Sequence, residues 1–111
     1  MSVYNLKDMI RINQEIGETG ELRNGSSLEF ALSMNKYNKS WLYKLCYLIR
    51  SILVDHPFID GNKRTAFVLC TIIFEDNNLN YNKDKLVIQL HMVAKKSITD
   101  LNKIARMLLK C

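Results

Sequence analysis

The chain has 111 residues, of which 48% are hydrophobic, so one domain over residues 1–111 with a buried core is expected. The formal net charge of +5 favours contact with phosphates, but the lysines and arginines are scattered, so a mildly basic surface is favoured over a nucleic-acid interface. The longest apolar runs are interrupted by Lys44, Arg50 and Asp55, which argues against a membrane-spanning helix.

The first predicted elements are two short helices joined by a loop. Apolar residues recur at helical spacing from Val3 to Glu15, and this helix is predicted to end near Gly17. A loop rich in turn-forming residues follows. Ser26 or Ser27 is then expected to cap a helix that runs through Met34, because a serine hydroxyl accepts hydrogen bonds from the free N–H groups of a first helical turn.

Two longer helices are predicted in the middle of the chain. The segment 40–55 carries apolar residues around most of its circumference, which predicts a buried helix with Ser40 as its N-cap. A second helix of this kind is predicted from the residue after Gly61 to about Asp76. Its β-branched residues also suit a strand, but its length and the flanking cap residues favour a helix.

Two further amphipathic helices complete the prediction. The segment 84–96 has a one-sided apolar stripe, and Thr99 or Asp100 is expected to cap a last helix that includes Leu101 and Leu109. The sequence contains no convincing pair of alternating strands. The predicted fold class is therefore all-α, with two central apolar helices wrapped by shorter amphipathic ones.

The three cysteines are Cys46, Cys70 and Cys111, and their odd number and wide spacing indicate neither a disulfide framework nor a metal clip. Cys46 and Cys70 lie in the predicted central helices and are expected in the core, whereas Cys111 is expected at the surface. Reduced thiols are typical of the cytoplasm, and the first residues lack the basic start and apolar run of a signal peptide. We therefore expect a cytoplasmic protein.

The sequence between the two central helices, HPFIDGNKR, has a purely structural interpretation. His56 suits the negative end of a helix dipole, and Pro57 cannot continue that helix. Phe58 is expected to plug into the core, and Asp60 is expected to cap the next helix by accepting from its free N–H groups.

The same residues also predict a phosphate site. A helix N-terminus preceded by glycine binds anions, because several N–H groups point outward without partners, and Gly61 permits close approach of a phosphate. Asn62 can donate to a phosphate oxygen, Arg64 can bind one bidentately, and Lys63 adds a further cation. Asp60 suits Mg²⁺, and His56 is a candidate general base.

The whole run from His56 to Arg64 resembles the signature of the Fic/Doc family, H-P-F-x-(D/E)-G-N-x-R. Upstream, GELRNGSSLEFAL is similar to a pattern of Doc-type (death-on-curing) members, whereas residues 79–111 match only in helical character. The resemblance implies a small all-α fold in which the motif loop joins two buried helices. It also implies an enzyme that transfers part of a nucleoside triphosphate to a hydroxyl of a target protein.

By position, the resemblance implies a role for each motif residue. His56 would deprotonate the acceptor hydroxyl, Asp60 would hold Mg²⁺, and Phe58 would anchor the loop in the core. The phosphates of ATP would be bound by the remaining residues, which are Gly61, Asn62 and Arg64, with Lys63 as a further cation.

Two positions depart from the Fic pattern and bear on which group is transferred. Lys63 stands where AMP-transferring members usually have a second glycine, and Phe67 stands where they carry a second arginine. Doc-type members share both departures, and in them the nucleotide is taken to bind in reverse, with the γ-phosphate facing the target. The resemblance therefore favours a toxin that phosphorylates a protein such as a translation factor over an enzyme that transfers AMP. A non-catalytic basic helical binding module is a third interpretation.

Many Fic proteins silence themselves with a helix bearing (S/T)-x-x-x-E-(G/N). The nearest match here, at residues 71–76, ends in the wrong residue and lies inside a predicted central helix, so the resemblance implies a separate antitoxin whose disordered tail folds on binding. His91 is expected to be a polar-face or structural histidine, because no motif supports a second catalytic one. Arg23 suits the mouth of the active site, the antitoxin groove or a turn cap equally well.

Overall fold

The computed structural model describes residues 4–111, and these residues form helices and no strand. The elements, in chain order, are α1 (Leu6–Glu15), α2 (Ser26–Ser33), the 3₁₀ turn η1 (Met34–Lys36), α3 (Trp41–Arg50), the π turn η2 (Ser51–Asp55), α4 (Asn62–Asp76), α5 (Lys83–Lys95) and α6 (Leu101–Leu109). The predicted all-α fold class is confirmed. Within the described part of the chain, no helix has the length and apolar character needed to cross a membrane.

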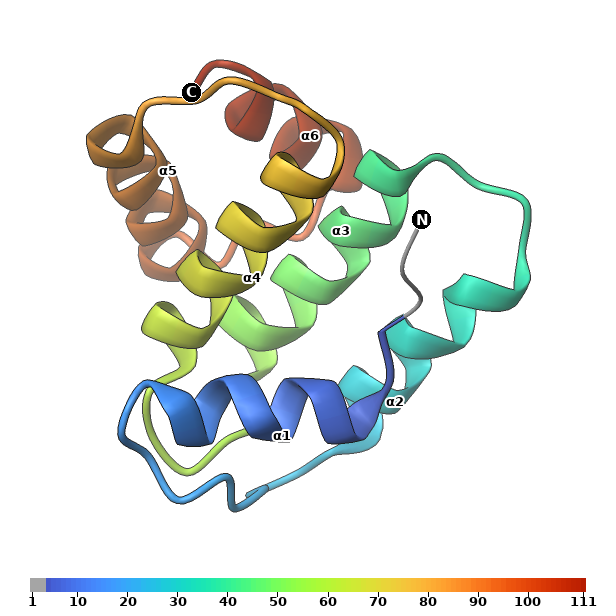
Figure 1. Cartoon of the computed structure of the whole chain (residues 1–111), viewed down its shortest axis with the longest axis vertical. Coiled ribbons are helices and arrows are strands. Elements are labelled where there is room, and N and C mark those ends of the chain that lie inside the picture. Colours follow the sequence, from blue (N-terminus) through green and yellow to red (C-terminus); the bar gives the residue numbers. More distant parts are fainter. Residues whose placement is uncertain (1–3) are drawn as a thin grey trace.

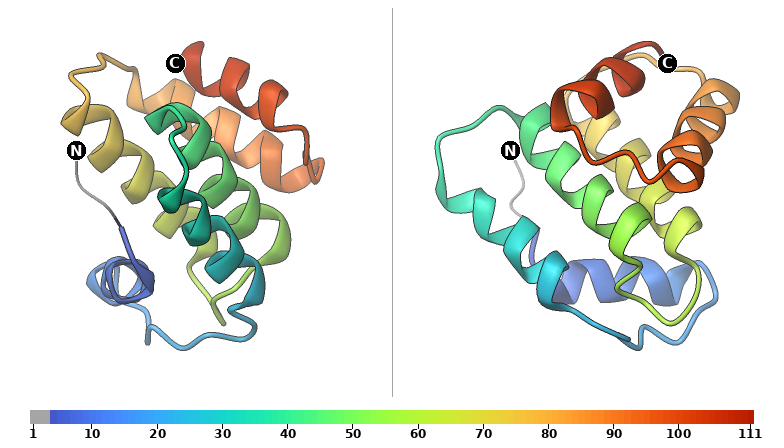
Figure 2. Two further views of the ribbon diagram at one scale, coloured as in Figure 1. Left: turned by 90° about the vertical axis from the view of Figure 1, so that its right-hand side faces the viewer. Right: turned by 180° about the vertical axis from the view of Figure 1, so that it is seen from behind.

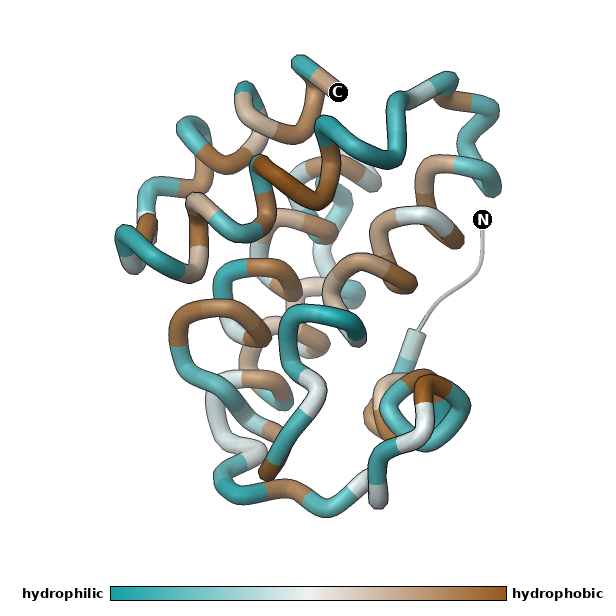
Figure 3. Tube along the Cα trace, turned by 90° about the vertical axis from the view of Figure 1, so that its left-hand side faces the viewer, coloured by the Kyte–Doolittle hydropathy of each residue, from teal (hydrophilic) through white to brown (hydrophobic). Residues whose placement is uncertain are grey.

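The centre of the fold consists of α3 and α4, which lie side by side (Figure 1). Helix α2 packs on α3, α5 packs on α4, and α6 packs on α3, while α1 crosses one end of the central pair and contacts α4 (Figures 1 and 2). Hydrophobic stretches occur along every helix, and the connections are mainly hydrophilic (Figure 3). This is the arrangement that two apolar central helices and shorter amphipathic ones predict.

Most of the predicted helix starts are close to those observed. Ser40 caps α3 by accepting from the N–H of Tyr43, and Asp100, rather than Thr99, caps α6. Helix α5 begins at Lys83, one residue before the predicted start, because Asn82 is its cap. Helix α1 begins at Leu6 behind an Asn5–Asp8 capping box, and the predicted start at Val3 lies outside the described residues.

The predicted serine caps of the second helix are wrong. Ser26 and Ser27 both lie inside α2, whose N-cap is Gly25, and no side chain caps this helix. The side chain of Asn24 accepts from the N–H of Ser26 instead, so an asparagine turn sets the start. The Ser27 hydroxyl points inward and shares a 2.8 Å hydrogen bond with the Ser51 hydroxyl.

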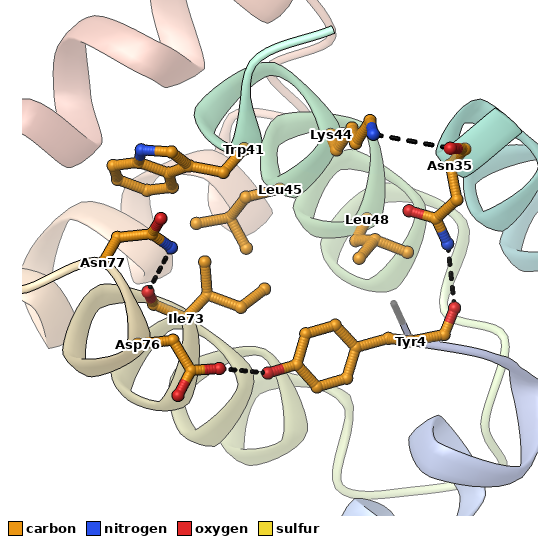
Figure 4. A pocket seen from close by; sticks show the side chains of 9 residues that line it. All are labelled: Tyr4, Asn35, Trp41, Lys44, Leu45, Leu48, Ile73, Asp76 and Asn77. Carbon is orange, nitrogen blue, oxygen red and sulfur yellow. Dashed lines mark hydrogen bonds between the residues drawn. The ribbon is translucent and has the colours of Figure 1, made fainter. Parts of the chain in front are cut away.

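The segment before α1 is attached to the far end of α4 (Figure 4). The Tyr4 hydroxyl donates to Asp76 Oδ2 at 2.8 Å, and Asn35 Nδ2 donates to the Tyr4 carbonyl at 2.8 Å. These contacts line a cavity of about 20 Å³ beside Trp41 and Ile73. They hold Tyr4 against both η1 and the last turn of α4.

The core contains two free cysteines, Cys46 and Cys70, as predicted. Cys111 was expected at the surface but is half-buried, with its thiol 3.5 Å from the Met107 carbonyl. Burial raises the pKa of the Cys46 thiol from 9.0 to about 12 and raises that of Cys70 well above its ordinary value. Both thiols are therefore neutral in the folded state wherever an unfolded cysteine begins to ionise.

These raised pKa values predict a loss of stability in alkali. The folded pKa lies above the unfolded one, so the contribution is complete below pH 9 and is lost as the pH rises towards about 12. Each buried thiol should lower the free energy of unfolding by up to about 1.4 kcal/mol per pH unit in that window. Urea unfolding at several pH values would measure the slope. It should be shallower in Cys46→Ala than in the wild type, and equal slopes would contradict the assignment.

Candidate active site

The predicted site lies where the central helices meet, in a loop with two left-handed residues. The π turn η2 ends at Asp55, and π turns interrupt helices often at functional sites. His56 follows with φ 50° and ψ 65°, and Gly61 is the N-cap of α4 with φ 76°. A Cβ on Gly61 would also lie 2.5 Å from Glu18 Cγ, so both conformation and space require glycine here.

The loop is closed by its own residues. Phe58 is fully buried, and its N–H donates to Asn62 Oδ1 at 3.1 Å. Asn62 Nδ2 donates back to the Phe58 carbonyl at 3.0 Å. Asn62 therefore supports the loop with its carbonyl and one amide hydrogen, which leaves the second amide hydrogen for the phosphate contact predicted from the resemblance.

The start of α4 has no side-chain cap. Asp60 was expected to cap it, but the Asp60 carboxylate accepts from the N–H of Gly61 at 2.8 Å, one residue too early, so this prediction is wrong. The N–H groups of the first turn of α4 are thus left to face a cavity of about 420 Å³. The cavity is lined by the predicted residues His56, Asp60, Gly61, Asn62, Lys63 and Arg64.

Arg64 is held by the end of α1, an interaction the sequence did not suggest. Its guanidinium forms an ion pair with Glu18 and donates to the Ile16 carbonyl at 3.0 Å. The side chain of Glu18 lies against Gly61. Its carboxylate therefore already neutralises part of the positive charge of Arg64 beside the cavity. Lys63 is exposed and forms no ion pair with residues 4–111.

The connection between α1 and α2 runs along the motif loop and pairs with it. Leu22 and Phe58 form an antiparallel bridge, and the N–H of Ile59 donates to the Glu21 carbonyl at 3.1 Å. The N–H of Arg23 donates to the Pro57 carbonyl at 2.7 Å, and Arg23 Nη2 donates to the His56 carbonyl at 3.0 Å. Arg23 therefore contacts the candidate active site through the backbone of the motif loop.

Asn13, on α1, links the motif loop, the start of α4 and the connection between α1 and α2. Its side chain is 1% exposed, and its Nδ2 donates to the Asp60 carbonyl at 3.0 Å and to Thr65 Oγ1 at 3.1 Å. Its Oδ1 accepts from the N–H of Gly20 at 2.9 Å. We did not predict this role of Asn13 from the sequence, although an asparagine on the apolar side of a helix indicates a buried polar contact.

A comparison with known protein families matches residues 3–74 to the Fic/DOC family. The match covers most of the chain, from α1 through the motif loop to the last turns of α4. The chain belongs to the Fic/DOC family. As a member of it, the protein is a protein-modifying enzyme of the Fic type. No curated protein and no solved structure matched the chain.

The Fic motif residues fit a metal that arrives with a nucleotide. One Asp60 oxygen is bound to the Gly61 N–H, and the other makes no hydrogen bond within residues 4–111. Mg²⁺ is commonly held by one or two carboxylates together with phosphate oxygens. Asp60 would supply the carboxylate, and the uncapped N–H groups of α4 with Lys63 would face the phosphates.

A second cavity, of about 240 Å³, adjoins the Fic motif between α4 and α5. It shares Lys63 and Arg64 with the first cavity, and its other walls are mainly apolar, formed by Phe67, Val87, Leu90 and His91. His91, which was expected to be a polar-face or structural histidine, is exposed on α5 at the edge of this groove. Trp41 lies elsewhere, where it lines the 20 Å³ cavity and packs edge-on against Phe74.

The contacts of Asn13 predict a specific loss of stability. Asn13→Ala leaves the buried Gly20 N–H and Asp60 carbonyl without this partner, so the free energy of unfolding should fall by about 2–4 kcal/mol. Glu15→Ala is the matched control, because Glu15 is exposed on the same helix, and its effect should stay below about 0.5 kcal/mol. Urea denaturation measures both, and similar values for the two variants would contradict the role of Asn13.

Proposed function

We propose that this Fic/DOC protein is a Doc-like toxin enzyme that transfers the γ-phosphate of ATP to a hydroxyl of a target protein. The observation that carries the proposal is the position of Phe67. This residue stands where AMP-transferring relatives would have an arginine, and it lines an apolar groove with Val87 and Leu90. An apolar wall therefore stands where a second cation for the distal phosphates would be. This supports the Doc-like orientation of the nucleotide, in which the γ-phosphate faces the target.

In the proposed reaction, His56 accepts the proton of the target hydroxyl as that oxygen attacks the γ-phosphorus. The bond from the γ-phosphorus to the oxygen bridging it to the β-phosphate breaks, and ADP leaves with the electron pair. Mg²⁺ on Asp60 would neutralise the phosphate charge. The N–H groups at the start of α4, Lys63 and Arg64 would hold the phosphates.

The groove between α4 and α5 supports a nucleotide as the donor. Its apolar walls and its volume of about 240 Å³ suit a flat, largely apolar group, and it opens beside the cations of the phosphate site. A base in the groove would place its phosphates towards Lys63 and Arg64.

Transfer of AMP is the second candidate within the same family. It is supported by Gly61 and Arg64, which the motif shares with nucleotidyl-transferring members. A non-catalytic basic binding module is the third, and it would leave His56 without a chemical role.

The proposed partners are a target protein, such as a translation factor, and a separate antitoxin in the cytoplasm. The nearest internal inhibitory pattern includes Glu75, but this residue accepts a 2.9 Å hydrogen bond from the Tyr81 hydroxyl at the far end of α4. Its position supports inhibition by another chain rather than by this segment.

The proposal predicts which phosphate reaches the target. Incubation with Mg²⁺ and ATP labelled at the α- or the γ-phosphate should label the target protein from the γ position. Intact-mass analysis should show the addition of one phosphate and no AMP. His56→Ala should lower transfer by at least about 10²-fold, whereas Glu15→Ala, an exposed residue of α1 that lines neither cavity, is the control and should transfer like the wild type. Label from the α position would instead establish AMP transfer, and unchanged transfer in His56→Ala would refute the catalytic role.

The Glu18–Arg64 ion pair predicts an effect on nucleotide affinity. A triphosphate must compete with the Glu18 carboxylate for Arg64, so Glu18→Gln should bind ATP about two- to fivefold more tightly, in keeping with a partly exposed ion pair. Glu21→Gln, on the same loop but without an ion pair, should bind like the wild type. Calorimetric titration measures both dissociation constants. Weaker binding by Glu18→Gln would mean that Glu18 orients Arg64 for the phosphate instead of competing with it.

A further inference from the structure

We propose that Arg23 is a positioning residue for His56, whose backbone it holds in the left-handed conformation that the active site uses. The inference rests on the proposed function, because the position of the His56 imidazole affects the reaction only if His56 is the general base. Arg23 lies 33 residues before His56 in the sequence, and its guanidinium reaches the His56 carbonyl at 3.0 Å.

The conformation of His56 needs external support. Its φ of 50° and ψ of 65° place a non-glycine residue in the left-handed region, where the Cβ of an L-residue lies too close to the following carbonyl oxygen. The next residue is Pro57, and the residue before a proline is disfavoured outside the extended region. Strain of this kind persists only where surrounding contacts hold it, and it gathers at functional sites.

The supporting contacts come from the segment that pairs with the motif loop. The N–H groups of Arg23 and Asn24 donate to the Pro57 carbonyl at 2.7 and 3.2 Å, and these backbone bonds do not depend on the side chains. The contact with the His56 carbonyl belongs to the Arg23 side chain alone. Substituting Arg23 therefore removes one contact and keeps the pairing of the two segments.

The consequence for catalysis follows from the shared backbone. Arg23 binds the carbonyl of His56, and His56 lines the cavity together with Asp60 and Gly61. If the His56 backbone relaxed towards an extended conformation, its Cα–Cβ bond would turn and the imidazole would move relative to Asp60. A displacement of about 1 Å in a catalytic group lowers a rate by up to about 10²-fold.

Arg23 makes no ion pair within residues 4–111. The position of its guanidinium at the His56 carbonyl is therefore not set by a salt bridge to another residue. Arg11 provides the matched control. It is also an exposed arginine, but its partner is Asp8 on its own helix, away from the motif loop.

The first test is kinetic and uses the labelled-ATP assay. Arg23→Ala should lower kcat about 10- to 100-fold and change KM for ATP by less than about threefold, because the phosphate contacts stay in place. Added guanidinium at millimolar concentration should restore part of kcat in Arg23→Ala and should not affect Arg11→Ala, whose kcat should equal that of the wild type. Transfer by the wild type with an unchanged kcat in Arg23→Ala would overturn the inference and leave the proposed function standing.

The second test does not need activity. The ¹³Cα and ¹³Cβ chemical shifts of His56 report its backbone conformation, and they should move in Arg23→Ala and return on addition of guanidinium. Unchanged shifts would overturn the inference. Moved shifts in a protein that transfers no label would support the contact and refute the proposed function. If Arg23→Ala does not fold, Arg23→Gln removes the charge but keeps an N–H donor, and the same shifts decide the question.

Discussion

One buried amide, that of Asn13, joins the three segments from which the site is built. It belongs to α1, it bonds to the Asp60 carbonyl and to Thr65 at the start of α4, and it accepts from Gly20 in the connection to α2. A buried amide leaves costly unsatisfied groups if any of these segments moves away. The pairing of the connection with the motif loop, the Glu18–Arg64 ion pair and the Arg23–His56 contact all depend on this placement.

The site is an interruption between two apolar helices. Helices satisfy their own backbone groups except at their ends, so a site that offers free N–H groups beside the core requires a helix start. The π turn, the left-handed His56 and the left-handed Gly61 create that start without separating α3 from α4. The structural and the chemical interpretations of the motif are therefore the same interpretation, because the break exposes the groups that can bind a phosphate.

The sequence predicted the local features well and the contacts between distant segments poorly. The central helices, the caps at Ser40 and Asp100 and the motif loop follow from periodicity and cap chemistry, which act over a few residues. Glu18 and Asn13 escaped prediction because their partners lie 46 to 52 residues away. The cap at Asp60 was wrong because the left-handed Gly61 is itself the N-cap residue, and the Asp60 carboxylate accepts from the Gly61 N–H instead.

Tyr4 and Asn13, which precede α2 in the sequence, hold α4 at both ends. Tyr4 forms a hydrogen bond with Asp76 in the last turn of α4, and Asn13 forms one with Thr65 in the first turn. Helix α4 has 15 residues, which corresponds to a length of about 22 Å. Because α4 is held at two points, these contacts oppose sliding of the helix as well as tilting. A ligand that pushed on the start of α4 would therefore have to strain the Tyr4 contact at the opposite pole, so the two ends of α4 are mechanically linked through the segment that contains α1.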